Sequence, residues 1–399
     1  MMIPHNDLDS TSSDFKTLEA VIERLHQTPH MLVYEFAGAG VQALAWLHAV
    51  AGSSATILEA NDRYSQKSFI ESAGFEPDKF VSLEASEALA KQALKRAQYL
   101  KPKHLKHERT AAIGVSCTAS IATSRPKRGE HKCFISIADE LAVTSYSLTL
   151  DKGARNRDEE EALVSILVIK AIAEACDLKT PELHLNTEDI LETYHSSSPA
   201  LLQLEKEEVN WLHFSSRGEV SAGKTLSNQL LLSGSFNPVH AGHLQLVKLV
   251  ADKKQKDVYF ELPLANAAKA TIGFEEAVRR ARQFIGKGDV ILSLSPLFYE
   301  KATVFPESMF IVGADTAVRL VQKRFYNDSE KEMLSSFEAV RKKGCSFIVA
   351  GRLIDDDFIT LDEIAIPETI KDLFEVLPEE VFRVDLSSTE IREKRKKLS

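Results

Sequence analysis

The chain has 399 residues, of which 44% are hydrophobic and 27% are charged, and its formal net charge is −9. This composition excludes global disorder and collagen-like character, and the length leaves room for two or three domains. The negative charge argues against a non-specific nucleic-acid binder, which needs a basic face, so we expect no nucleic-acid partner.

The first residues, Met1–Asp9, contain neither the basic block nor the apolar block of a signal peptide. No apolar run is long enough to cross a bilayer. We therefore expect a cytoplasmic protein without a membrane partner. The four cysteines are widely spaced and form no Cys-x-x-Cys motif, a pattern that predicts neither a disulfide framework nor a metal site.

Residues 15–178 alternate short apolar runs with stretches of helical periodicity, which predicts an α/β layer domain. The predicted strands are Met31–Phe36, Ala55–Glu59, Ala111–Val115, Cys133–Ala138 and Ser145–Leu150. The predicted helices are Val41–Val50, Ser86–Tyr99 and Asp158–Cys176. Residues 179–228 are rich in turn-forming residues, and we predict a linker region there.

Residues 229–399 show the same alternation, which predicts a Rossmann-like, doubly wound parallel sheet with ligands beyond the carboxyl ends of its strands. The predicted strands are Leu230–Ser233, Val258–Leu262, Val290–Leu294, Met309–Val312, Ser346–Ala350 and Phe382–Asp385. The predicted helices are His240–Ala251, Phe274–Ile285, Thr316–Phe325 and Ser335–Lys342.

The segment Leu230–Leu244 runs from an apolar strand through a glycine turn into a helix that begins with two histidines. Such a turn brings free backbone N–H groups and both imidazoles together, which is typical of an anion site. For the histidines alone, two other interpretations stay open, namely polar surface residues and half of a metal site. Their combination with the glycine turn favours a phosphate site.

The stretch Gly234-Ser-Phe-Asn-Pro-Val-His240-Ala-Gly-His243 resembles a signature of the nucleotidyltransferase superfamily, which includes nicotinamide and nicotinate mononucleotide adenylyltransferases. A second signature of that superfamily, Ser-Ser-Thr-x-Ile-Arg, is matched at Ser387–Arg392. The resemblance implies catalytic roles for His240, His243 and Arg392. It implies nucleotide binding by Gly234, Ser235, Phe236, Gly242, Ser388 and Thr389.

Three further residues are candidates by position. Asp315 matches a family segment that lies along the nucleotides, although a plain helix N-cap explains it nearly as well. Lys269 occupies a place where many family members carry a basic residue for the acceptor's phosphate, and a solvated lysine is an equal alternative. Arg352 follows a predicted strand and is a weaker candidate for contact with the triphosphate.

The resemblance implies adenylyl transfer from ATP to a small phosphorylated acceptor, such as nicotinamide or nicotinate mononucleotide, with release of pyrophosphate. The attacking phosphate oxygen is already anionic, so positioning and charge neutralisation should carry the rate. We expect Mg²⁺ to enter with ATP, held mainly by phosphates and water. The Pro-His-Lys stretch of the mononucleotide adenylyltransferases is missing at Ala267–Lys269, which leaves the acceptor open.

Residues Gly218–Thr225 match the P-loop pattern letter by letter. A functional P-loop opens a helix, because its lysine and its backbone amides act together at the helix N-terminus. Too few residues follow Thr225 before the next predicted strand for a helix to form. We therefore predict that this match has no P-loop function.

Residues 31–138 resemble the C-terminal domain of CinA proteins, whose active members deamidate nicotinamide mononucleotide. That resemblance rests on Ala51–Ala55, Tyr64–Ser65 and Val115–Ser120. Phe36 stands where active members carry the nucleophilic serine, and phenylalanine cannot act as a nucleophile. We therefore expect a retained scaffold with lost or altered catalysis.

Three functions are thus weighed. The favoured one is a nucleotidyltransferase. The alternatives are a nicotinamide-nucleotide amidohydrolase that uses the N-terminal domain, and a non-catalytic nucleotide-binding regulator. The sequence leaves the oligomeric state open, homo-oligomers included.

Overall fold

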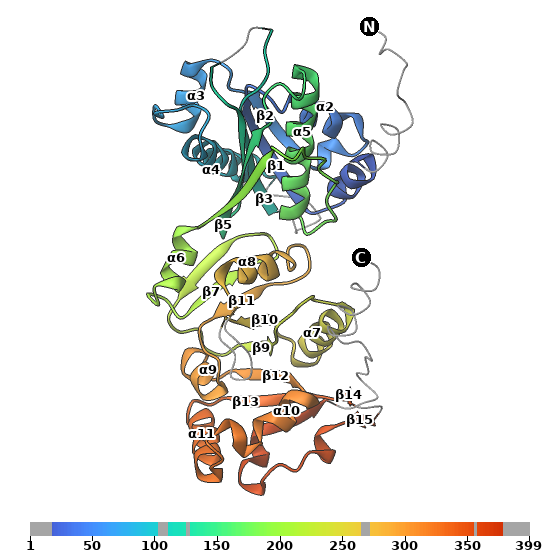
Figure 1. The fold of residues 1–399 in the computed structure, drawn as a ribbon. Helices are drawn as coiled ribbons and strands as arrows, with labels where there is room; N and C mark the ends of the chain where they lie inside the picture. Colours follow the sequence, from blue (N-terminus) through green and yellow to red (C-terminus); the bar gives the residue numbers. More distant parts are fainter. Residues whose placement is uncertain (1–17, 103–110, 125–127, 265–271, 355–356, 378–399) are drawn as a thin grey trace. The chain divides into compact units, whose positions relative to one another are not determined.

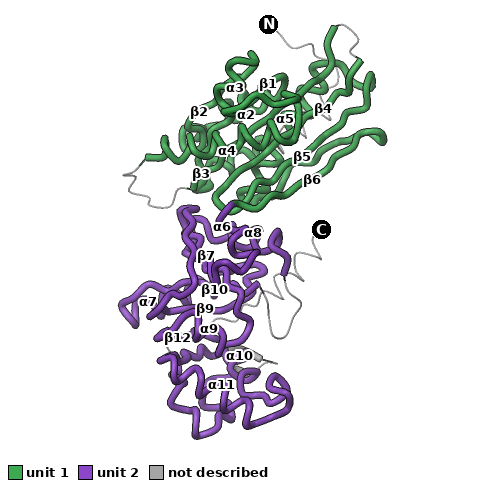
Figure 2. Tube along the Cα trace, turned by 90° about the vertical axis from the view of Figure 1, so that its left-hand side faces the viewer, with its two compact units in different colours: residues 1–198 green, residues 199–399 purple. Residues whose placement is uncertain are grey.

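The computed structural model describes residues 18–102, 111–124, 128–264, 272–354 and 357–377 (Figure 1). The chain divides into two compact units, Met1–Ser198 and Pro199–Ser399 (Figure 2). In the part of the chain that is described, none of the helices has the length and apolar character needed to cross a membrane.

The first unit contains a six-stranded mixed sheet in the order β2-β1-β3-β4-β5-β6. Its strands are β1 (His30–Ala37), β2 (Ile57–Asp62), β3 (Ala111–Ser120), β4 (His131–Ala138), β5 (Ala142–Leu150) and β6 (Ile190–Ser197). The strands β2, β1 and β3 are parallel, whereas β3 to β6 form an antiparallel meander. The predicted α/β fold is therefore confirmed, with an antiparallel half that the alternation of strands and helices did not indicate.

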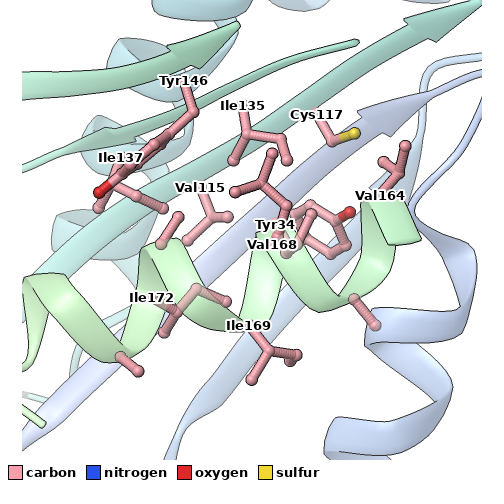
Figure 3. Packing of buried hydrophobic residues seen from close by; sticks show 14 of the residues in the cluster. Tyr34, Val115, Cys117, Ile135, Ile137, Tyr146, Val164, Val168, Ile169 and Ile172 are labelled. Atoms are coloured by element: carbon pink, nitrogen blue, oxygen red, sulfur yellow. The ribbon is translucent and has the colours of Figure 1, made fainter. Parts of the chain in front are cut away.

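Helices cover this sheet on both faces. They are α2 (Val41–Ala49), α3 (Gln66–Ala73), α4 (Leu83–Leu100) and α5 (Arg157–Ala175). A capping box begins α5. In it, the Asn156 side chain accepts the Glu159 backbone N–H, and the Glu159 carboxylate accepts the Asn156 backbone N–H. Figure 3 shows Val164 and Val168 of α5 directed at the sheet, where they join one buried apolar cluster with Val115.

On the other face, α4 lies unusually close to β3 at Gly114. A Cβ atom on Gly114 would lie 2.0 Å from the Ala90 carbonyl oxygen and 2.2 Å from the Leu94 nitrogen. Both neighbours are helix backbone and cannot rotate aside. Nearby, the buried hydroxyl of Ser86 from α4 lies 2.9 Å from that of Ser116 on β3, so the polar groups in this tight contact satisfy each other.

The second unit contains an eight-stranded sheet in the order β16-β13-β12-β9-β10-β11-β7-β8. Its strands are β7 (Trp211–Phe214), β8 (Val220–Gly223), β9 (Leu230–Ser233), β10 (Val258–Pro263), β11 (Val290–Ser293), β12 (Met309–Gly313), β13 (Ser346–Ala350) and β16 (Phe374–Leu377). The strands from β16 to β11 are parallel, and the β7–β8 hairpin adds antiparallel strands beside β11. The predicted parallel sheet is confirmed.

The connections between these strands change direction at β9. The helices of this unit are α6 (Pro199–Glu205), α7 (Ala241–Lys254), α8 (Phe274–Arg282), α9 (Phe298–Val304), α10 (Ala314–Leu320) and α11 (Glu330–Lys342). The chain moves outward from β9 through β10 to β11, and then returns to place β12 on the other side of β9. A crevice beyond the carboxyl ends of β9 and β12 is the usual ligand position in such sheets.

Most predicted elements lie where the sequence placed them, and the differences are local. The helices α3 and α9 and the strand β16 were not predicted, because each is a short element of four to eight residues without a full period of apolar residues. The predicted strand Phe382–Asp385 and the Ser387–Arg392 signature lie outside the described residues.

The segment 179–228 contributes β6 to the first unit and α6, β7 and β8 to the second, and the first unit ends at Ser198 along the chain. Within it, residues 218–225 lie in and around the β7–β8 hairpin, with no helix after Thr225. A P-loop needs a helix directly after its lysine and Ser/Thr residues, and the expectation that no helix forms between Thr225 and β9 is confirmed. The absence of P-loop function stays a prediction.

We expect Gly114→Ala to lower the free energy of unfolding of the first unit by about 1–3 kcal/mol, since overpacking against rigid backbone cannot relax. Trp46 lies in α2 and Trp211 in β7, so denaturant unfolding of a Trp211→Phe background, followed by Trp46 fluorescence, reports on this unit. Gly129→Ala is the matched control, because a Cβ there meets nothing within 4 Å. Equal stability of the two variants would contradict the prediction.

Candidate nucleotide site

The loop after β9 is anchored by a buried aromatic ring. Phe236 has a positive φ of 41° and is only 2% exposed. Its ring makes edge contacts with Phe260, Phe284 and His243. A Cβ on Gly234 would lie 2.8 Å from this ring, so glycine is needed for the ring to fold back under the turn. The sequence-predicted turn residues therefore form one packed unit.

The two histidines lie together at the start of α7. His240 is the N-cap residue, and the rings of His240 and His243 are stacked with their centroids 3.7 Å apart. The Nδ1 atom of His243 accepts the His240 backbone N–H at 3.3 Å. This bond places the proton of the neutral His243 ring on Nε2, where it can serve as a donor. Gly242, between them in the first turn, is buried.

The side chains of Arg280 in α8 and of Gln283, the C-cap residue of that helix, hold the loop from its other side. Arg280 donates from Nη1 to the Ser235 carbonyl oxygen at 2.9 Å. Gln283 donates from Nε2 to the Phe236 carbonyl oxygen at 3.3 Å and accepts the Val239 N–H at 3.2 Å. The sequence analysis did not single out Arg280 or Gln283. The available signal was that both interrupt the apolar stripe of α8 formed with Ala277 and Phe284.

Glu276 orients the cationic groups of α8. Its carboxylate lies 2.6 Å from Nε of Arg279 and 2.7 Å from Nε of Arg280. Hydrogen bonds from Arg279 and then Arg280 lower the pKa of Glu276 from 4.5 to about 2. Arg280 is therefore fixed between a carboxylate of its own helix and the backbone of the loop.

A buried ion pair lies one strand away from the loop. The Gly234 N–H donates to the Glu261 carbonyl oxygen on β10 at 3.0 Å. The Glu261 carboxylate binds Lys301 of α9 and the Ser293 hydroxyl, and all three side chains are buried. Burial lowers the pKa of Lys301, and the Glu261 carboxylate opposes that effect. The pair compensates two charges that would be costly if separated in the interior.

Asp315 and Arg352 follow the next two strands at the same edge of the sheet. Asp315 lies in the first turn of α10, and its carboxylate pairs with Arg319 at 2.7 Å. The N-cap of α10 is Gly313, so the alternative that Asp315 is only an N-cap is wrong. Arg352 begins β14 (Arg352–Ile354), directly after β13. The loops after β9, β12 and β13 thus leave adjacent strands at their carboxyl ends.

The remaining site predictions lie outside the described residues. These are Lys269, Ser388, Thr389 and Arg392. The ends of the segment that contains Lys269 are tied together, because the Ile272 N–H donates to the Leu264 carbonyl oxygen at 2.9 Å. That segment leaves the carboxyl end of β10, beside β9. The last described strand, β16, ends at Leu377 beside β13.

The glycine turn of the first unit is occupied by the chain's own carboxylate. Glu161 of α5 accepts the N–H groups of Gly40 at 2.9 Å and Gln42 at 3.1 Å. Glu161 is 8% exposed. An anion is thus already present where the Gly38–Gly40 turn could take a phosphate. Phe36, at the position of the nucleophilic serine, is buried in the apolar core.

The comparison with protein families assigns the second unit. Residues 231–394 match the cytidylyltransferase-like family. This family lies within the nucleotidyltransferase superfamily, so the resemblance drawn from the histidine and serine-threonine signatures is confirmed for this segment. Among curated proteins, no sequence matches the chain.

Solved structures of CinA-family proteins are similar to part of the chain. CinA is the family that the first half of the sequence resembles. The competence/damage inducible protein CihA from Agrobacterium tumefaciens is 16% identical, with a TM-score of 0.30, over 42% of this chain and 95% of that one. A CinA superfamily protein from Escherichia coli is 12% identical, with a TM-score of 0.29, over 43% and 94%. One from Klebsiella pneumoniae is 11% identical, with a TM-score of 0.30, over 40% and 96%.

Within the described ranges, no group of three or more His, Cys, Asp or Glu side chains is arranged to hold a metal ion. All four cysteines are free thiols and buried.

We expect Glu276→Gln to destabilise the second unit at pH 7 and to have less effect in acid. Because the folded-state pKa is lowered from 4.5 to about 2, the stabilisation is fully present above pH 4.5 and disappears as pH falls from 4.5 through about 2. The free energy of unfolding of the second unit is measured at each pH by Trp211 fluorescence in a Trp46→Phe background. Glu368→Gln, which removes an exposed ion pair with Lys371, is the control, and a pH-independent difference would contradict the prediction.

Proposed function

We propose that the second unit transfers an adenylyl group from ATP to a small phosphorylated acceptor and releases pyrophosphate. The observation that carries the proposal is the position of the stacked His240–His243 pair. It lies at a helix N-terminus that follows β9, the strand where the sheet changes direction, inside the segment that matches the cytidylyltransferase-like family. A nicotinamide or nicotinate mononucleotide is the acceptor that the resemblance favours.

In the proposed reaction, a phosphate oxygen of the acceptor forms a bond to the α-phosphorus of ATP while the bond to the bridging α–β oxygen breaks. The leaving group departs as pyrophosphate. His240, His243 and the amides of Ser235 and Phe236 hold the triphosphate, since the Gly234 N–H is already bonded to the Glu261 carbonyl oxygen. The His243 Nε2–H donates to oxygens that gain negative charge. Mg²⁺ enters with ATP and neutralises its phosphates.

The remaining proposed contacts complete the site. Asp315 accepts hydrogen bonds from the nucleotides, Arg352 contacts the triphosphate, and Lys269 binds the acceptor's phosphate. Ser388, Thr389 and Arg392 bind the β- and γ-phosphates.

The direct test incubates the full chain with Mg²⁺, either ATP or CTP, and a panel of phosphate monoesters that includes both mononucleotides, and follows pyrophosphate release. The proposal expects release with ATP and at least one acceptor. Release with CTP alone would overturn the adenylyl assignment but keep the nucleotidyl transfer. Binding of ATP without release for any acceptor would favour the non-catalytic regulator.

We expect His243→Ala to lower kcat by roughly 10²- to 10³-fold with a much smaller loss of ATP affinity, because a preorganised donor acts mainly on charge that develops during the reaction. Steady-state kinetics and calorimetric ATP binding measure the two effects separately. His48→Ala, an exposed histidine of the first unit, is the control. Equal losses of kcat and affinity would instead mark His243 as a binding residue.

A further inference from the structure

We infer that Arg280 and Gln283 are positioning residues that orient two peptide groups of the Ser235–Asn237 turn toward the triphosphate. The inference rests on the proposed function, since it assigns the turn a nucleotide ligand. It adds a role for Arg280 of α8 and for Gln283, the C-cap residue of that helix. No motif marks either side chain, and both lie 44 to 47 positions further along the chain than the residues that they contact.

The contacts are made by buried polar groups. Arg280 is 8% exposed and Gln283 is 3% exposed. Each donates to a carbonyl oxygen of the turn, Arg280 to Ser235 and Gln283 to Phe236. The Gln283 carbonyl also accepts the Val239 N–H, so one amide side chain grips the turn at two points.

Because the peptide group is planar, the direction of each bound carbonyl also fixes the direction of the N–H group that follows it. In a trans peptide the C=O and the N–H of the next residue point in opposite directions. The cis bond in this turn is Asn237–Pro238, and the two preceding peptides are trans. With the Ser235 and Phe236 carbonyls directed at α8, the N–H groups of Phe236 and Asn237 are directed away from it.

The arrangement resists rotation of these peptides. Flipping the first peptide would remove the acceptor of Arg280 Nη1, and flipping the second would remove one of the two acceptors of Gln283 Nε2, and losing a hydrogen bond is costly in a desolvated position. Phe236 cannot follow such a flip, because its ring is enclosed by Phe260 and Phe284. Glu276 holds the Arg280 Nε at 2.7 Å, so the donor itself is fixed. The two N–H groups are thus preorganised for an anion.

The test compares Arg280→Gln, Gln283→Met and the control Lys287→Gln. The control removes one positive charge, as Arg280→Gln does, from an exposed residue beyond α8. Three quantities are measured for each full-length variant: pyrophosphate release with ATP, calorimetric binding of ATP and of inorganic tripolyphosphate, and unfolding followed by Trp211 fluorescence. Amide NMR shifts of Phe236 and Asn237 on titration with tripolyphosphate report the turn directly.

We expect kcat/KM to fall roughly 10- to 100-fold for Arg280→Gln and Gln283→Met at temperatures where both are fully folded, because small displacements of positioned groups have effects of this size. The tripolyphosphate-induced shifts of Phe236 and Asn237 should shrink in parallel. Lys287→Gln should change neither quantity by more than about twofold, the scatter typical of surface substitutions.

The outcomes separate this inference from the proposed function. An active wild type whose α8 variants lose stability but keep kcat/KM and the amide shifts would overturn the positioning role alone. A wild type that binds tripolyphosphate with those shifts, but never releases pyrophosphate, would overturn the proposed function and leave the orientation of the turn supported. A wild type that binds neither ATP nor tripolyphosphate would overturn both.

Discussion

The second unit depends on the way one short turn is fixed between strand β9 and helix α7. The Phe236 ring fills the space beneath Gly234, and the polar side chains of α8 bind the carbonyl groups of the turn. The first turn of α7, with its stacked histidines, continues directly from this anchored backbone. Because aromatic packing and buried hydrogen bonds act on the same few residues, the turn has one conformation that satisfies both.

The strand order of the sheet determines which loops leave it beside this turn. Since β9 has β10 on one side and β12 on the other, the loops after all three strands leave the same edge. Asp315 follows β12, and the segment with Lys269 follows β10. The turn after β9 and Asp315 after β12, about 80 positions apart, therefore lie at one edge of the sheet through strand order alone.

The two units use a similar local pattern with different outcomes. In each, a buried strand runs into a glycine turn and then a helix. In the first unit the amides of Gly40 and Gln42 bind the carboxylate of Glu161, and the nucleophile position is a buried Phe36. In the second unit the turn carbonyls are bound by α8. An internal carboxylate satisfies the first turn, whereas the second turn is the one for which we propose an external anion.

The sequence by itself determined most strands of the two sheets, the glycine turn, the two histidines and the similarity of the second unit to a known family, because these depend on local apolar periodicity and on a contiguous motif. It did not determine the antiparallel half of the first sheet, the hydrogen bonds of Arg280 and Gln283 to the turn, or the hydrogen bond from the Gly40 N–H to Glu161. The contacts of Arg280, Gln283 and Glu161 join residues 44 to 121 positions apart, and no local pattern encodes which distant polar group meets a given backbone atom. Only tertiary packing, which must pair each buried donor with an acceptor, decided them.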